Sequence, residues 1–134
     1  MGAATDVKPR ERVKYSYTAY GDCLNCCDPM LTVEATQPLN MDDIEASFLE
    51  FITDYFSNEM GRKPEFETDF DPFTGTVVQV SGADLFTIHY GGNGYVNRFG
   101  LESHLSGLGG FGFNKLRAKH VLQKYVSHLN QEER

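Results

Sequence analysis

The chain has 134 residues, of which 40% are hydrophobic and 13% aromatic, and 19 acidic against 12 basic residues give a formal net charge of −7. This length fits one domain with its own core, and the aromatic content excludes an intrinsically disordered chain. The negative charge argues against direct binding to nucleic acid, because it repels a phosphate backbone.

Neither a membrane segment nor a targeting segment is indicated. The apolar runs are much shorter than the roughly 20 residues that cross a bilayer, and the N-terminus lacks the charged and then apolar pattern of a signal peptide. Residues 1–11 are mostly small or polar and predict a flexible N-terminus, followed by a single domain over residues 12–134. We therefore expect a soluble, cytoplasmic protein without a membrane partner.

Two strands are predicted at the start of the domain. Polar and apolar residues alternate over residues 13–20 and again from residue 30 to residue 37. The connecting segment GDCLNCCDPM contains all three cysteines of the chain. An antiparallel pair joined by a cysteine-containing loop is the expected arrangement.

The cysteine cluster allows three interpretations: a metal site, a redox pair, or structural thiols in a loop. Cys23 and Cys26 have the CxxC spacing with which two thiolates bind one ion, and Cys27 is adjacent. A structural zinc site needs four ligands, however, and without a second CxxC a distant histidine such as His89 would have to contribute. A redox motif needs a helix that begins within it, which Pro29 and the following strand pattern contradict. We favour structural thiols without a cofactor and keep zinc at Cys23, Cys26 and His89 as the alternative.

A long amphipathic helix is predicted over residues 41–60. Asn40 can cap its first turn, and Gly61 followed by Pro64 ends it. Apolar residues recur on one wide face at helical spacing. The narrow opposite face is acidic and consists of Asp43, Ser47, Glu50 and Asp54. We expect the helix to lie on a sheet with its acids in water.

The acidic charge is concentrated in residues 41–71. Ten acids stand against Arg62 and Lys63, so this window carries −8 and the rest of the chain +1. Its last part alternates phenylalanines with acids, which is typical of an exposed edge segment whose charges block unwanted strand pairing. The acids of this segment are Glu65, Glu67, Asp69 and Asp71. A string of carboxylates can also imitate the spacing of phosphates and so occupy a nucleic-acid-binding protein.

Three further strands and a second helix complete the domain. The strands are predicted over residues 75–81, 85–90 and 95–99, and their short glycine-containing connections favour an antiparallel meander. The final helix begins after Asn114. The order β-β-α-β-β-β-α predicts an α+β fold, with an antiparallel sheet of about five strands and two amphipathic helices packed on it.

Two more features have both a functional and a structural interpretation. The segment GLGGFG, residues 107–112, could hold an anion near a helix N-terminus, or its aromatic residues could pack or dock. The final helix carries a basic row of Arg117, His120, Lys124 and His128. This row could bind an acidic partner or the acidic helix of a second copy, or it could be a solvated face.

No coherent catalytic constellation emerges, so we predict a binding module and not an enzyme. The favoured function is that of an acidic accessory or inhibitory protein whose partner is another protein with a basic surface, such as a nucleic-acid-binding protein. The predicted partner-binding residues are Asp43, Glu50, Asp54, Glu65, Glu67, Asp69 and Asp71. A second copy of the chain is an alternative partner. The alternative function is that of a small metal- or thiol-dependent protein that uses the cysteine cluster with a distant histidine.

Overall fold

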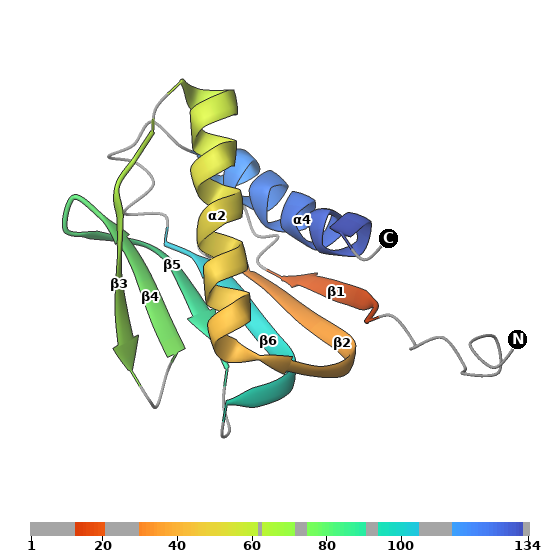
Figure 1. Cartoon of the computed structure of the whole chain (residues 1–134). Coiled ribbons are helices and arrows are strands. Elements are labelled where there is room, and N and C mark those ends of the chain that lie inside the picture. The colour runs from red at the N-terminus through yellow and green to blue at the C-terminus, as the bar shows by residue number, and fades with distance from the viewer. Residues whose placement is uncertain are drawn as a thin grey trace, which may run out of the picture.

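Six strands form one antiparallel sheet in the computed structural model, and two helices pack against it (Figure 1). The structure describes residues 13–20, 30–61, 63–71, 75–90, 94–104 and 114–132. In chain order the elements are β1 (Tyr15–Tyr20), β2 (Met30–Asn40), α2 (Met41–Met60), β3 (Phe66–Asp71), β4 (Gly75–Val80), β5 (Ala83–His89), β6 (Tyr95–Ser103) and α4 (Lys115–Glu132). The predicted α+β class is confirmed. The strand number is six and not five, because the acidic edge segment forms β3.

In the strand order β1-β2-β6-β5-β4-β3, α2 connects β2 to the far edge of the sheet. Strands β3 to β6 form a meander, whereas the β1–β2 hairpin joins the sheet beside β6. The chain must therefore cross from β2 to the far edge, over four strand spacings of about 4.8 Å each. A helix of 20 residues is about 30 Å long and can cover this distance.

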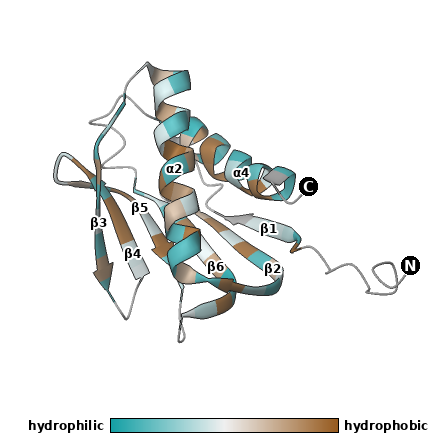
Figure 2. Cartoon of the chain, in the orientation of Figure 1, coloured by the Kyte–Doolittle hydropathy of each residue, from teal (hydrophilic) through white to brown (hydrophobic). Residues whose placement is uncertain are grey.

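The sheet has one apolar face and one polar face. Cross-strand pairs such as Leu31 with Leu101 and Val33 with Phe99 are buried beneath the helices. Their chain neighbours point the other way, because successive side chains alternate between the faces of a strand. Hydrophobic residues recur along both helices and the central strands (Figure 2). Both helices cover the apolar face, which leaves what we call the open face of the sheet on the other side.

Phe48 of α2 occupies the centre of the core. It is 0% exposed and contacts two rings edge-on, with centroid distances of 5.3 Å to Phe86 of β5 and 5.1 Å to Tyr125 of α4. The Tyr125 hydroxyl donates to Ser47 Oγ at 3.0 Å, which satisfies a polar group in a buried position. Phe48 thus connects both helices to the sheet.

The helix ends follow the sequence signals. Asn40 Oδ1 accepts hydrogen bonds from the backbone N–H groups of Asp42 at 2.9 Å and Asp43 at 3.3 Å. Gly61 ends α2 in a left-handed conformation with φ of 69°. Asn114 Oδ1 accepts from the backbone N–H of Arg117 at 2.8 Å. The predicted caps of both helices are confirmed.

Strand β6 is longer than the sequence indicated. It continues through Gly100 to Ser103, although the glycine resembled the start of a loop. A Cβ atom at position 100 would lie 3.2 Å from Met30 Cε and 3.5 Å from His89 Cβ. The end of the Met30 side chain can give way by the small amount needed, and Gly100 pairs with Thr32 and His89 on either side, so the glycine lies within the strand and is not a break.

Three sequence predictions concern segments outside the described residues. These are the flexible N-terminus over residues 1–11, the cysteine cluster, and the GLGGFG segment over residues 107–112. They stay predictions. Among the helices that the structure describes, none is both long and apolar enough to cross a membrane.

Candidate functional site

The acids predicted on α2 lie on its solvent side. Asp43, Glu50 and Asp54 are exposed, whereas Ile44 and Ile52 of the opposite side are buried. This matches the helical period of about 100° per residue, which places Asp43, Glu50 and Asp54 together on one side and separates them from Ile44 and Ile52 by about 80° or more. We call Asp43, Glu50 and Asp54 the helix acids.

The acids of β3 point toward the open face of the sheet. Phe66 lies on the helix side, since its ring is 5.9 Å from that of Phe56 of α2. Alternation along the strand therefore directs Glu67, Asp69 and Asp71 the opposite way. Glu65, just before the strand, is also exposed. We call Glu65, Glu67, Asp69 and Asp71 the strand acids.

The predicted partner-binding residues therefore form two surfaces and not one. The helix acids lie above the helix layer, and most of the strand acids face away from it. Among the described residues, no Lys, Arg or His side chain lies within 4.0 Å of the carboxylates of Asp43, Glu50, Asp54, Glu67 or Asp69. These charges are therefore not neutralised by ion pairs within the described part of the chain.

The basic row of α4 runs along the flank of α2. His120 Nδ1 is 3.3 Å from the Tyr55 hydroxyl, and the ring of His128 is 5.0 Å from that of Phe51. Burial raises the pKa of Tyr55, while its hydrogen bond to Arg117 opposes this rise. The row is partly engaged with aromatic residues of α2, so it is more than a solvated helix face.

His89, the predicted distant metal ligand, lies on the open face. Its Nε2 is 2.7 Å from Glu102 Oε1, and the two side chains are 35% and 29% exposed. Nearby, His104 Nε2 is 2.6 Å from Thr87 Oγ1. Within the described ranges no three His, Cys, Asp or Glu side chains are placed to hold a metal ion. Because Cys23 and Cys26 lie outside those ranges, the zinc hypothesis stays a prediction.

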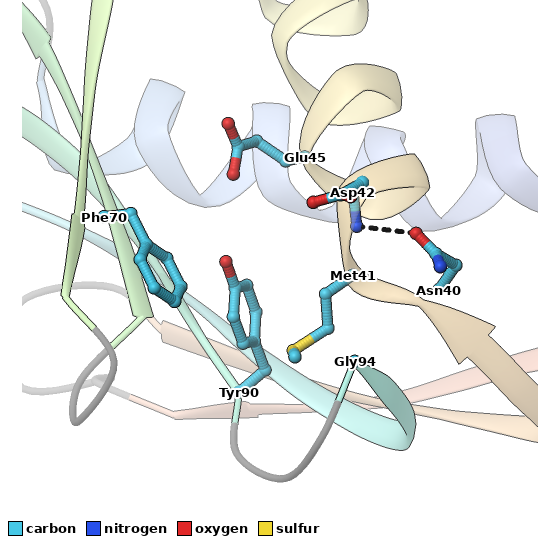
Figure 3. Close-up of a pocket in the computed structure, with 7 residues that line it drawn as sticks. All are labelled: Asn40, Met41, Asp42, Glu45, Phe70, Tyr90 and Gly94. Carbon is cyan, nitrogen blue, oxygen red and sulfur yellow. Dashed lines mark hydrogen bonds between the residues drawn. The ribbon is translucent and has the colours of Figure 1, made fainter.

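A cavity of about 330 Å³ opens at the start of α2 (Figure 3). Carboxylates of α2 border one side, and an aromatic pair from the sheet borders the other. The rings of Phe70 and Tyr90 are stacked, with centroids 6.4 Å apart and an interplanar angle of 24°. The lining residues are Asn40, Met41, Asp42, Glu45, Phe70, Tyr90 and Gly94. We call this space the α2 cavity.

A chain of hydrogen bonds holds two lining residues of the α2 cavity in place. Thr76 Oγ1 donates to Glu45 Oε2 at 2.9 Å and lies 2.6 Å from the Tyr90 hydroxyl. A threonine hydroxyl has one hydrogen, so the Tyr90 hydroxyl must donate in the second contact. Thr76 is 0% exposed. Glu45 and Tyr90 are thereby held in place by a buried residue.

The α2 cavity has a negative potential. Burial raises the pKa of Tyr90 above its ordinary value of 10.0, and the negative charges of Glu45 and Asp42 act in the same direction. The hydrogen bond to Thr76 opposes the rise. The charges of Glu45 and Asp42 therefore act on the Tyr90 phenol, and they would act in the same way on a ligand in the same space.

We expect Glu45→Gln to lower the pKa of Tyr90, because the substitution removes a negative charge and keeps an oxygen that accepts from Thr76. Tyrosine titration followed by NMR measures this, and Tyr55, whose environment does not include Glu45, serves as the internal control. An unchanged or raised Tyr90 pKa would contradict the negative potential. Since the folded pKa lies above 10.0, the contribution of Tyr90 to stability is present below that pH and is lost as the pH rises through the folded pKa.

Sequence reasoning did not predict the α2 cavity. Asp42 and Glu45 belong to the acidic window, but they were not among the predicted binding residues. Phe70 was assigned to an edge segment and Tyr90 to a strand end, with no sign that they meet. The only local signal in the sequence is Phe70, a large aromatic residue in a predicted edge segment. In the structure it is 59% exposed.

A second cavity of about 280 Å³ lies on the other side of the α2 start. It is mainly apolar, with Leu39, Ile44 and Phe99 in its lining and Asp43 among the lining residues. It lacks the combination of carboxylates and stacked rings found in the α2 cavity. The α2 cavity therefore has the more distinctive recognition chemistry.

Comparison of the chain with protein-family models, with curated proteins and with solved structures finds no match.

Proposed function

We propose that this protein is a binding module that captures a basic protein partner through the outer surface of α2. The observation that carries the proposal is the row of helix acids, Asp43, Glu50 and Asp54, which is exposed and has no ion pair in the described part of the chain. Such a row attracts lysine and arginine side chains and accelerates encounter with them.

We assign partner binding to the helix acids in preference to the strand acids. Asp42 and Asp43 occupy the same first turn, so the row extends to the mouth of the α2 cavity. A partner on the helix side can therefore contact both the charged row and a recessed site. For the strand acids, protection of the β3 edge against unwanted pairing is a sufficient role.

The alternative function, a metal- or thiol-dependent protein, has no support from the described residues around His89. One zinc ion per purified chain, lost on Cys23→Ser, would favour it over partner binding.

The test is partner capture from the native host followed by affinity measurement with the purified partner. The triple variant Asp43→Lys, Glu50→Lys, Asp54→Lys is expected to weaken binding at least tenfold at low salt, because attraction becomes repulsion. High salt should weaken the wild-type complex by screening. Unchanged affinity in a folded triple variant would overturn the proposal.

A further inference from the structure

We infer that the α2 cavity receives the guanidinium group of an arginine side chain presented by the basic partner. This inference deepens the proposed function and rests on it. Three independent properties of the cavity carry it: its size, its aromatic wall and its charge.

The size of the cavity fits one side chain. Its volume of about 330 Å³ is at the lower end of the roughly 300–1,000 Å³ that small-molecule pockets occupy. It opens between α2 and the β3 edge, where a side chain from another protein can enter (Figure 3). This volume can hold one long side chain or a small ligand of similar size, but not a large cofactor.

The aromatic wall favours a planar cation. Phe70 stacks on Tyr90 and is 59% exposed, so its ring is accessible to a side chain of a partner. A guanidinium can lie flat against a ring face, where the quadrupole of the ring attracts it. The wall thus provides a docking plane for the cation.

The charge of the cavity selects a cation over an anion. Glu45 uses Oε2 for Thr76, but a carboxylate has about four lone-pair positions and can accept further donors. The helix N-terminus contributes about half of one positive charge, which Asp42 and Glu45 together outweigh. Burial is the main cause of the raised pKa of Tyr90, and the charges of Glu45 and Asp42 act on this pKa in the same direction.

Arginine fits better than lysine because its planar fork donates several hydrogen bonds at once. It can pair with the carboxylates of Asp42 and Glu45 while its plane rests on Phe70. The ammonium group of lysine is more strongly hydrated and cannot stack in this way.

The inference is tested with N-acetyl-arginine amide, whose neutral isostere, N-acetyl-citrulline amide, has nearly the same shape. NMR of the Phe70 and Tyr90 rings should show saturable shifts with the arginine compound, and at least tenfold weaker binding of the citrulline compound. Equal binding of the two compounds, or equal binding of the lysine analogue, would overturn the assignment.

Matched variants locate the site. Glu45→Gln keeps the acceptor for Thr76, so the fold should persist while the affinity for the arginine compound falls about tenfold. Phe70→Leu should lower the affinity about threefold. Glu50→Gln makes the same change on the outer side of the same helix and should have no effect. A fall of the same size with Glu50→Gln would contradict a site in the cavity.

The failures of the inference and of the proposed function are distinguishable. If wild-type protein does not bind the arginine compound but the triple variant loses the partner, only the cavity assignment fails. If the compound binds but the triple variant retains the partner, the surface proposal fails and the cavity is a guanidinium site with another purpose.

Discussion

Phe48→Ala is expected to lower the free energy of unfolding by about 3–5 kcal/mol, the usual cost of emptying a buried phenylalanine position. Phe48 is 0% exposed and lies edge-on to Phe86 and Tyr125. Its removal leaves a cavity where α2, α4 and the sheet meet, and these elements cannot all move inward to fill it. Urea denaturation measures the loss.

Phe70→Ala is the matched control for this prediction. The same atoms are removed, but Phe70 is 59% exposed, so we expect a loss below about 1 kcal/mol. Comparable losses for the two variants would mean that Phe48 is not at the centre of the core.

Gly75→Ala is expected to destabilise the protein by about 3 kcal/mol, from a steric clash and an unfavourable backbone conformation together. Gly75 has a φ of +118°, and a Cβ atom there would lie only 1.9 Å from the carbonyl oxygen of Ile88. Because Thr76 pairs with Ile88 in the next register position, relief of the clash must shift β4 against β5. The same shift would disturb the hydrogen bonds of Thr76 to Glu45 and Tyr90, which line the α2 cavity.

Gly82→Ala separates the steric clash from the unfavourable backbone conformation. Gly82 also has a positive φ, of +79°, but no atom lies within 4 Å of the position of a Cβ. It should cost only the conformational part, about 1 kcal/mol. Equal losses for Gly75→Ala and Gly82→Ala would show that contact with Ile88 is unimportant.

The helices and their ends could be predicted from the sequence because their signals are local. Asn40 and Gly61 act on residues within one turn of themselves, and the apolar period of α2 needs no knowledge of its neighbours. Five of the six strands were predicted from alternation, whereas β3 was identified only as an acidic edge segment. The predicted strand ended at Phe99, whereas β6 continues because Gly100 pairs with Thr32 and His89, which are distant in sequence.

The arrangement of the acids could not be predicted in this way. Charge counted along residues 41–71 suggests one acidic surface, but the side of the sheet that each carboxylate faces depends on where the helices pack. Phe66 contacts Phe56 of α2 and so lies on the helix side of the sheet. Because side chains alternate along a strand, the acids next to it in β3 lie on the open face. The α2 cavity is equally non-local, since Glu45 lies in α2, Phe70 in β3 and Tyr90 directly after β5.

The central claim is that the helix acids, and not the strand acids, capture the partner. Its most direct test compares the partner affinity of two triple variants with the same change in net charge: Asp43→Lys, Glu50→Lys, Asp54→Lys on the helix, and Glu65→Lys, Glu67→Lys, Asp69→Lys on the strand. At low salt the helix variant should bind at least tenfold more weakly than wild type, and the strand variant within about threefold of it. Equal weakening by both variants, or a larger loss from the strand variant, would contradict the claim.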